Sequence, residues 1–440
     1  MERLPLTSFQ RKIFFIIATA WFFDSMDLGM LTFVLGSIKT DFHLTNVQAG
    51  LLSSASFLGM FFGAGTAGML ADRFGRKIVF QTSMILWGAA SILCSFATSV
   101  EMLAIFRIIL GFGMGMEFPI GQSLVSEFIP AQHRGRYIAL LEGFFPLGFI
   151  GAGLLSYLIL PIGGWRMVFI CEGIPAIFVL IIRRIVPESP RWLDDVGKHE
   201  EANRVMTMFE ENVQKAYGKE LPPVKDNIIA PSHEKRTFVS AFLDLWAPGY
   251  KKRTTMVWIW WFFALLGYYG LTTWLGAFLQ QAGYSVTKSV FYTLLISLAG
   301  VPGFFTAAYL VEKIGRKPSV IIVLIGCAIS TYFYGTAWSL TSLIGFGLCM
   351  QYFLFGMWST MYAYTPELYP TRSRATGSGF ASSLGRFGSL LGPYIVALVL
   401  PTAGNSGVFA LGAGCFIVAA ITVGILGVET KGKVLEDISV

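Results

Sequence analysis

Charged side chains are scarce in this sequence. Lys, Arg, Asp and Glu make up 13% of its 440 residues, whereas hydrophobic residues make up 54%. Soluble domains carry roughly 25% charged residues, so the composition excludes an ordinary soluble protein. Apolar runs of about 20 residues, the length that crosses a bilayer core as a helix, recur from one end of the chain to the other. The sequence therefore predicts an all-α polytopic membrane protein.

Residues that build metal and redox sites are also few. The five cysteines all lie within apolar runs, and the four histidines (His43, His133, His199, His233) lie at loops or helix ends. Neither set has the spacing of metal ligands or of a disulfide framework. We therefore predict no metal, no cofactor and no enzymatic activity. No small-residue cleavage site follows the first apolar run, so we expect a retained span and not a signal peptide.

The apolar runs predict twelve membrane spans. Their expected ranges are 13–38, 48–71, 78–98, 102–124, 137–160, 166–186, 254–280, 289–311, 318–338, 343–364, 376–398 and 407–428. Basic residues concentrate in the loops on the side of both termini, while the opposite loops hold only Lys39, Arg166 and Lys288. By the positive-inside rule, both termini are expected in the cytoplasm. The net charge of +7 then reflects topology, and no nucleic-acid partner is expected.

The sequence repeats itself at an offset of 240 residues. "GMLADRFGRK" (68–77) returns as "AYLVEKIGRK" (308–317), and "SEFIPAQHRGR" (126–136) returns as "PELYPTRSRATG" (366–377). "VPESPRW" (186–192) has a shorter counterpart, "VETKG", shifted by one more residue. Three matched blocks at nearly constant spacing indicate an internal duplication.

The duplication predicts two six-helix bundles in the same orientation. The N-terminal bundle covers 1–186 and the C-terminal bundle covers 254–440, joined by the polar segment 187–253. Within that segment, "HEEANRVMTMFEENVQKA" (199–216) predicts an amphipathic helix outside the membrane.

Four motifs carry a family resemblance. "GMLADRFGRK", "RIILG" (107–111), "PESPRW" and "VETKG" together resemble the signature set of the major facilitator superfamily, in the form shared by its sugar-porter-like branches. "FFDSMDLGMLTF", "GYYGLTTWLGAFL", "YAYTPELYPTRSRATGSG" and "GRFGSLLGP" resemble the bacterial niacin permeases, which are relatives of the synaptic-vesicle-like and organic-ion transporters. The resemblance covers essentially the whole chain. It implies alternating access between two bundles, with a substrate site near the membrane midplane.

Ten charged residues at helix ends on the side of the termini form a second pattern. They are Asp72, Arg76, Glu127, Arg134, Glu188, Glu312, Arg316, Glu367, Arg374 and Glu429. We expect acids of one bundle to face basic residues of the other and to form a gate that closes this side. The positive-inside rule alone explains the basic residues, but it does not explain why acids recur at equivalent positions of the two halves. Each exposed pair contributes on the order of 0–1 kcal/mol. Several pairs together can therefore shift the equilibrium between an open and a closed gate without making either state irreversible.

Seven further charges fall inside predicted spans, where charged residues are functional candidates by default. They are Asp24, Asp27, Arg107, Glu117, Glu142, Glu172 and Arg386. Asp24 and Asp27 are three residues apart and share one helix face, so both are candidates for substrate binding and for proton coupling. Arg107 is expected to form an intramembrane ion pair with Asp27, which leaves Asp24 freer to hold a proton. Glu142 is the second proton candidate, and Glu172 is expected near the outer surface.

Arg386 is the candidate anchor for the substrate. It lies among the glycines of "SLGRFGSLLGP", and the resemblance to organic-ion transporters implies that an arginine here goes with anionic substrates. A guanidinium grips a carboxylate through two parallel hydrogen bonds. A second internal ion pair is the alternative interpretation.

Span 7 narrows the class of substrate. It reads "TTMVWIWWFFALLGYYGLTTW" and has no amide before Gln280, whereas a sugar site needs amides and hydroxyls to satisfy a polyol. Aromatic residues from several helices are expected at the site instead: Phe145, Trp261, Tyr268, Trp358 and Tyr362. Packing or lipid contact is the alternative for any single one. Their convergence beside one arginine favours a flat aromatic anion.

These observations predict a secondary transporter for a small aromatic carboxylate, with nicotinate first and proton coupling left open. An aromatic-acid:proton symporter for hydroxybenzoate-like acids is the nearest alternative, because that family shows a similar aspartate pair. Span 7 disfavours a sugar porter, and "EGFFPLGFIGAG" departs from the drug-antiporter pattern. A non-transporting receptor is disfavoured by the intact gate charges. The expected partners are the lipid bilayer, the substrate and protons, and a monomer is expected.

Overall fold

The computed structural model describes residues 3–223, 242–369 and 374–431, and the described chain is helical throughout. The first half contains α1 (Ser8–Asp41), α2 (Asn46–Phe74), α3 (Arg76–Ser95), α4 (Val100–Phe128), α5 (Ala131–Glu142), α6 (Phe144–Gly173), the 3-10 helix η1 (Ile174–Phe178) and α7 (Val179–Ile185). The second half contains α11 (Lys251–Thr272), α12 (Leu275–Gln281), α13 (Val286–Ser297), α14 (Gly300–Ile314), α15 (Arg316–Gly335), α16 (Leu340–Tyr364), η2 (Thr365–Leu368) and α17 (Arg374–Leu426). Between the halves lie α8 (Pro190–Asp195) and α9 (His199–Tyr217).

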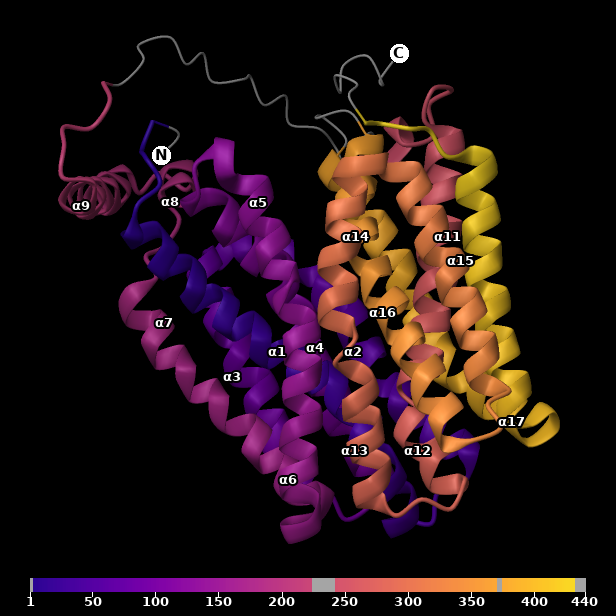
Figure 1. The fold of residues 1–440 in the computed structure, drawn as a ribbon. Coiled ribbons are helices and arrows are strands. Elements are labelled where there is room, and N and C mark those ends of the chain that lie inside the picture. The colour runs from indigo at the N-terminus through magenta and orange to yellow at the C-terminus, as the bar shows by residue number, and fades with distance from the viewer. Residues whose placement is uncertain (1–2, 224–241, 370–373, 432–440) are drawn as a thin grey trace.

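Ten helical segments of the described chain are long and apolar enough to cross a membrane, and two of them run for 51 residues. A straight helix of that length would extend about 75 Å, far beyond the ~30 Å hydrocarbon core. Each contains a glycine with positive φ, Gly164 at 66° and Gly404 at 62°, a conformation that glycine adopts without steric cost. Figure 1 shows α17 reversing direction. Each long segment is therefore two spans, which confirms the twelve predicted.

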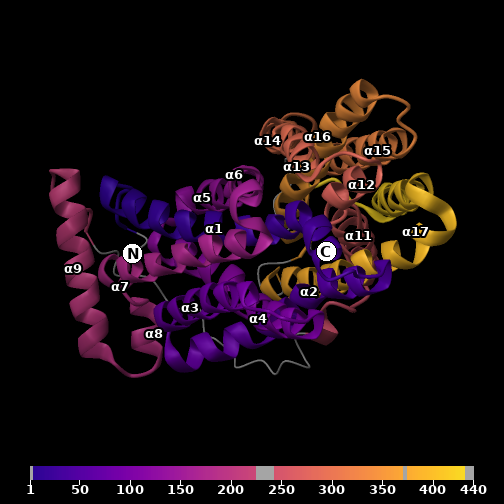
Figure 2. The same ribbon diagram turned by 90° about the horizontal axis from the view of Figure 1, so that it is seen from below.

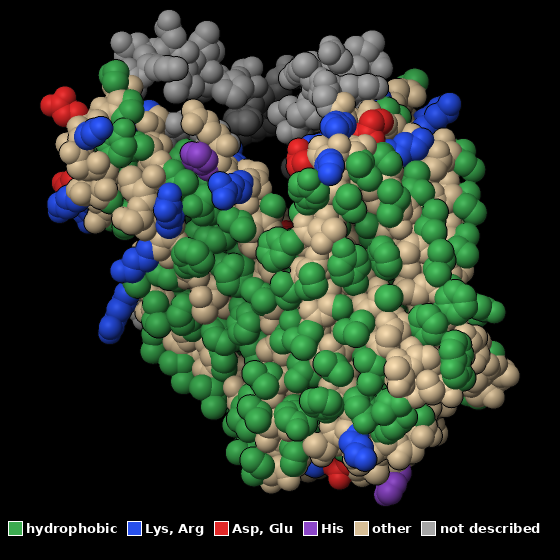
Figure 3. Space-filling model, in the orientation of Figure 1, with side chains coloured by type: hydrophobic (Ala, Val, Ile, Leu, Met, Phe, Trp, Pro, Cys, Tyr) green, Lys and Arg blue, Asp and Glu red, His purple; other side chains and the backbone are tan. Residues whose placement is uncertain are grey.

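The two halves form two helix bundles that lie side by side (Figures 1 and 2). Both chain ends lie at one face, here called the terminal face, where α1 begins and α17 ends. Hydrophobic side chains cover the sides of the molecule, and Lys and Arg side chains gather at the terminal face (Figure 3). The helix expected at 199–216 is present as α9, and Phe209 fixes it by packing against Phe9 and Phe128, with ring centroids 5.1 and 5.7 Å away.

Two of the expected spans are broken, each four residues before a proline. α5 ends at Glu142 and α6 contains Pro146, while α13 ends just before Leu298 and α14 contains Pro302. A proline ring collides with the carbonyl of the residue four positions earlier and removes one helical hydrogen bond. The first break matters for function, because it leaves Glu142 as the last residue of its helix.

Helices within the first bundle approach one another through glycines. A Cβ added to Gly111 of α4 would lie 2.0 Å from the Ser56 carbonyl oxygen of α2, and one added to Gly59 would lie 2.0 Å from the Ile108 carbonyl oxygen. Such small-residue contacts let backbones approach closely in the membrane, where van der Waals packing drives helix association. The glycines therefore fix α2 against α4.

The two bundles touch on the side away from the terminal face. A Cβ on Gly36, near the end of α1, would lie 2.3 Å from the Gln280 side chain of α12, and Ser54 Oγ donates a hydrogen bond to the Leu390 carbonyl oxygen at 2.6 Å. Toward the terminal face, the space-filling view shows a recess between the bundles (Figure 3). The structure is thus closed at the opposite face and open at the terminal face.

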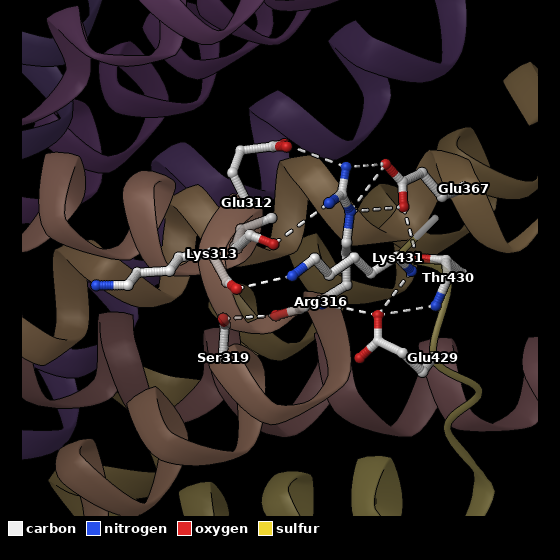
Figure 4. Close-up of polar contacts among 10 residues, drawn as sticks. Glu312, Lys313, Arg316, Ser319, Glu367, Glu429, Thr430 and Lys431 are labelled. Atoms are coloured by element: carbon white, nitrogen blue, oxygen red, sulfur yellow. Dashed lines mark hydrogen bonds and ion pairs between the residues drawn. The ribbon is translucent and has the colours of Figure 1, made fainter. Parts of the chain in front are cut away.

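A charged cluster organises the turn between α14 and α15 (Figure 4). Arg316 forms ion pairs with Glu367 at 2.9 Å and with Glu312 at 3.1 Å, and Glu429 accepts backbone hydrogen bonds from Arg316 and Lys317 at 3.0 and 3.1 Å. Gly315 has a φ of 107°, and a Cβ there would lie 2.7 Å from the Glu429 carboxylate. The turn therefore requires glycine for both its conformation and its space.

The first bundle repeats this cluster at equivalent positions. Arg76 pairs with Glu127 at 3.1 Å and with Asp72 at 3.7 Å, and Glu188 accepts a hydrogen bond from the Lys77 backbone at 3.1 Å. Gly75 has a φ of 98°. The duplication read from the sequence is therefore also a duplication of contacts.

The close packing of α2 against α4 gives a stability prediction. Gly111→Ala should destabilise the protein by on the order of 1–3 kcal/mol, because a methyl group cannot fit against the Ser56 backbone without moving a helix. Gly65→Ala is the matched control, since a Cβ there meets nothing within 4 Å. Melting temperatures in detergent should fall for Gly111→Ala only. Equal melting temperatures would contradict the packing described here.

The environment of Glu429 gives a pH prediction. Burial acts to raise the pKa of Glu429, but the backbone N–H groups of Lys431, Arg316, Lys317 and Thr430 outweigh burial and hold the pKa below its usual 4.5. A carboxylate with a lowered pKa stabilises the fold above its ordinary pKa, and this stability is lost as the pH falls through the lowered value. The melting-temperature gap between wild type and Glu429→Gln should therefore be widest at neutral pH and shrink as the pH falls below the usual 4.5.

The equivalent residue of the first bundle supplies the control. Burial raises the pKa of Glu188 despite its backbone hydrogen bonds, so its contribution weakens as the pH rises. The gap between wild type and Glu188→Gln should change in the opposite direction. Gaps that do not vary with pH in either variant would rule out these carboxylates as the titrating groups.

Candidate functional site

A cavity of about 530 Å³ lies between the two bundles. Both bundles line it: Leu28, Phe57, Met60, Phe118, Glu142 and Phe145 come from the first, and Trp261, Leu265, Tyr269, Phe304, Trp358, Tyr362, Ser382, Arg386 and Ser389 come from the second. This volume includes space that is open to solvent. A site shared by two bundles is the place where a bound molecule can affect their relative position.

Five predicted substrate-binding residues line this cavity, namely Phe145, Trp261, Trp358, Tyr362 and Arg386. Three others, Tyr268, Asp24 and Asp27, do not line it in this structure. Tyr268 is buried behind the wall, with its ring 5.4 Å from that of Trp358. Asp24 and Asp27 have no exposed surface and lie inside the first bundle. A ligand in this cavity therefore cannot contact either carboxyl group, and the free-energy cost of burying them must be met within the first bundle.

Tyr269 takes the place predicted for Tyr268. Trp261, Leu265 and Tyr269 follow one another at intervals of four residues and all line the cavity, so they lie along one stripe of α11. The spacing from Trp261 was visible in the sequence, but it fits both tyrosines nearly equally well. Phe118 of α4 carried no comparable signal, and only its place in the cavity wall beside Arg386 reveals it.

Aromatic rings from both bundles form the cavity wall. The rings of Trp358 and Tyr362 are stacked at 5.8 Å with an angle of 20°, and Phe145 lies 5.3 Å from Trp358. Phe57 and Tyr269 meet across the two bundles at 4.5 Å. The Trp358 side chain also lies within hydrogen-bonding range of the buried Tyr268 hydroxyl. The wall therefore offers flat faces for an aromatic ring.

Arg386 is the cation of this cavity. Its guanidinium lies 5.7 Å from the Phe118 ring, and no described Asp or Glu carboxylate lies within 4.0 Å of it. The alternative interpretation of Arg386 as a second internal ion pair is therefore wrong for the part of the chain that the structure describes. A positive charge facing a cavity without a protein counter-ion is suited to an anionic ligand.

Glu142 faces the same cavity from the first bundle. Its side chain is 3% exposed, and Gln122 Nε2 donates a hydrogen bond to Glu142 Oε1 at 2.7 Å. The cavity therefore has a carboxyl group on one bundle and a guanidinium on the other.

The remaining intramembrane charges form a separate cluster inside the first bundle, called here the carboxyl cluster: Asp24, Asp27, Arg107, Glu117 and Glu172. The expected pair is present, with Arg107 Nη1 3.7 Å from Asp27 Oδ2. Glu117 Oε2 accepts a hydrogen bond from Trp87 Nε1 at 2.9 Å. The carboxyl groups of Asp24 and Glu117 lie close enough to share a hydrogen bond when one of them is protonated, and Asp24 also lies within electrostatic range of Asp27.

Glu172, expected near the outer surface, is buried within the first bundle. Its side chain is 2% exposed, and it interacts electrostatically with Asp27 and Arg107. The depth of Glu172 along its span suggested an interfacial residue, but its helix directs the side chain toward the bundle interior. Four acids thus share one arginine. Within the described chain, no group of three or more His, Cys, Asp or Glu is arranged to hold a metal ion.

The ten expected gate residues lie at the terminal face, but their pairing differs from the expectation. Arg76 pairs with Glu127 and Asp72 of its own bundle, and Arg316 pairs with Glu367 and Glu312 of its own bundle. Glu188 and Glu429 bind backbone amides in their own bundles, and the side chain of Arg374 lies outside the described residues. The pairs described for Arg76 and Arg316 thus lie within one bundle each, where pairs across the bundles were expected. An internal repeat places each acid near the arginine of its own copy, so local pairing satisfies the charges while the terminal face is open.

Comparisons with known proteins agree with this architecture. Residues 15–440 match the family model described as "Sugar (and other) transporter". The chain is 38% identical over 439 residues to the niacin transporter NiaP of Acinetobacter baylyi, covering 100% of this chain and 98% of the relative. It is 35% identical to the putative niacin/nicotinamide transporter NiaP of Bacillus subtilis, covering 97% and 98%. The 4-hydroxybenzoate transporter PcaK of Acinetobacter baylyi is 29% identical, covering 94% of this chain and 90% of the relative.

The fold is also similar to a solved structure. The xylose transporter XylE from E. coli, in its inward-open conformation, superposes with a TM-score of 0.76 and covers 98% of this chain and 99% of XylE at 20% identity. At that identity, the likeness shows the fold alone. The family match spans nearly the whole sequence, and the chain belongs to the sugar (and other) transporter family of the major facilitator superfamily.

Proposed function

We propose that this transporter carries a small aromatic carboxylate, with nicotinate as the first candidate. The observation that carries the proposal is Arg386, a guanidinium that lines an aromatic cavity without a carboxylate partner among the described residues. A carboxylate held there would form charge-assisted hydrogen bonds in a partly dry site, where such bonds are strongest. The stacked rings of Trp358 and Tyr362 would receive the flat ring of the substrate.

The relatives support the same class of substrate. Two proteins named as niacin transporters are 38% and 35% identical over nearly the full length. A polyol substrate fits less well, because the described lining residues include no Asn or Gln and only two Ser hydroxyls, Ser382 and Ser389.

The mechanism that we propose is alternating access with both termini in the cytoplasm. The terminal face carries the basic residues (Figure 3), as the positive-inside rule expects of the cytoplasmic side. With this orientation the cavity is open to the cytoplasm and the contacts near Gly36 and Ser54 close the outer side. Import would require these contacts to separate while the terminal face closes.

The carboxyl cluster is our candidate for proton coupling, with Asp24 as the residue that titrates. Four acids and one arginine would leave a net charge of about −3 in the membrane if all were ionised, and burying uncompensated charge is very costly. Some of these acids must therefore hold protons. Asp27 has the basic partner Arg107, whereas Asp24 faces another acid, Glu117, and forms no ion pair within the described chain. Glu142, which faces the cavity, remains the second candidate.

A hydroxybenzoate-like acid is the second candidate substrate. The 29% identity to a 4-hydroxybenzoate transporter and the same arginine and aromatic wall support it. Competition between the two acids for uptake into liposomes distinguishes them.

The role of Arg386 can be tested with an acid and its amide. Arg386→Ala should weaken nicotinate binding by about 1.5–3 kcal/mol, the contribution of charge-assisted hydrogen bonds. Arg386→Lys should also bind nicotinate more weakly, because lysine keeps the charge and loses the forked geometry. The affinity for nicotinamide should fall much less in both variants, and the melting temperature of the protein should change little. Dissociation constants and melting temperatures of purified protein provide the measurement.

Arg107→Ala is the matched control for this test. It removes the partner of the buried Asp27, so it should lower the melting temperature and affect acid and amide alike. If Arg386→Ala behaved like Arg107→Ala, Arg386 would be part of the scaffold. Saturable glucose uptake with no response to nicotinate would overturn the proposed substrate class.

The coupling proposal predicts a separation of accumulation from exchange. In liposomes, an inward proton gradient should drive wild-type protein to concentrate nicotinate. Asp24→Asn should abolish this accumulation and leave exchange across the membrane, because the amide cannot take up a proton. Asp195→Asn, at an exposed carboxylate of α8, should behave like wild type. An Asp24→Asn variant that still accumulates substrate would exclude Asp24 as the proton carrier.

A further inference from the structure

Glu142 has one carboxyl oxygen that the protein does not use. Oε1 accepts the hydrogen bond from Gln122 Nε2 at 2.7 Å, and Oε2 has no hydrogen-bond partner among the residues that the structure describes. Oε2 is not fully enclosed by the surrounding protein, and the Glu142 side chain lines the cavity. The unused oxygen therefore faces the space that a substrate would occupy.

Glu142 forms no ion pair with a Lys, Arg or His of the described chain. Its only recorded partner in the described chain is the neutral amide of Gln122, and its side chain is 3% exposed. A buried carboxyl group with only an amide as partner is more stable as the neutral acid. In that form Glu142 presents an O–H donor to the cavity.

Glu142 and Arg386 face the same cavity from opposite bundles. Tyr362, which lines the cavity, lies within electrostatic range of both side chains. A ligand that satisfies both groups needs a carboxylate at one edge of an aromatic ring and a hydrogen-bond acceptor at another. The Trp358 and Tyr362 rings beside them suit a flat ring between the two.

We propose that Glu142 is a specificity-determining residue, which recognises the ring nitrogen of a pyridine carboxylate while Arg386 holds the carboxylate. The proton on Oε2 forms a hydrogen bond to the nitrogen lone pair. A pyridinium form of the ligand would satisfy the same contact with the proton on nitrogen and Glu142 ionised, so the pair shares one proton in either case. This inference rests on the proposed function.

Benzoate is the probe that isolates this contact. It has the size, shape and charge of nicotinate but carries C–H where nicotinate carries nitrogen. A buried donor that meets C–H is left unsatisfied, and sites built around a hydrogen bond reject the analogue that lacks it. Wild-type protein should therefore bind nicotinate about ten- to a hundredfold more tightly than benzoate.

The experiment compares dissociation constants of nicotinate and benzoate for purified wild type and three variants. Glu142→Met removes the donor at similar length, so the preference should collapse through weaker nicotinate binding while benzoate changes by less than about threefold. Glu142→Gln keeps an N–H donor and should retain most of the preference. Asp195→Asn alters an exposed carboxyl of α8 outside the cavity and should leave the ratio unchanged. An unchanged ratio in Glu142→Met, or equal losses of both ligands, would overturn the proposal.

A series of ligands tests the proposal without any variant. Picolinate, nicotinate and isonicotinate place the nitrogen at three different positions relative to the carboxylate. Since Glu142 and Arg386 are fixed on helices, one isomer should be favoured over benzoate and the others should not. Equal binding of benzoate and all three isomers would refute the role of Glu142 and leave the proposed class of substrate intact. Failure of wild type to bind any of the four acids would instead refute the proposed function.

Discussion

The cost of burying charge where water is absent shapes this protein more than any other constraint. Each charged group inside the bundles must find a partner, lose its charge, or face a cavity that something else can fill. Arg107 and Asp27 follow the first course, at 3.7 Å from each other. Asp24 and Glu117, which lie within electrostatic range of each other with no cation between them, follow the second. Arg386 follows the third. In the function that we propose, these three solutions correspond to a scaffold pair, a proton store and a ligand anchor within one chain.

The same constraint acts differently at the terminal face, where water is available. The clusters around Arg76 and Arg316 close within their own bundles, and the duplication gives both bundles the same set of contacts. Each cluster fixes helix ends within one bundle, so the bundles can move as units. Pairs across the bundles would have to replace some of these local pairs when the terminal face closes. Because exposed pairs are individually weak, such an exchange of partners has a small net cost in either direction.

The sequence predicted the architecture better than it predicted the directions of side chains. The spans and the repeat were readable because hydropathy and the offset of 240 residues involve many residues at once. The direction of one side chain depends on a fraction of a helical turn. That is why Tyr268 was preferred to Tyr269, and why Glu172 was placed at the surface. The break before Pro146 was visible as a proline, yet its consequence for Glu142 follows only from the packed structure. The repeat places a possible acidic partner for each arginine in its own bundle and another in the opposite bundle. The sequence therefore does not determine which of the two partners is used.

The unpaired guanidinium also explains how binding and closure can be linked. While the cavity is open to the terminal face, water can solvate Arg386. Closing the cavity around a bare guanidinium would remove that water without supplying a partner, which is costly. In the function that we propose, a bound carboxylate would supply the partner, and its aromatic ring would cover Trp358 and Tyr362, which come from the same bundle as Arg386. Glu142 and Phe145 would contact the ligand from the other bundle only if the two bundles stay close. Such a ligand would favour the closed cavity through its differential contacts, which is the requirement for a ligand to shift a conformational equilibrium.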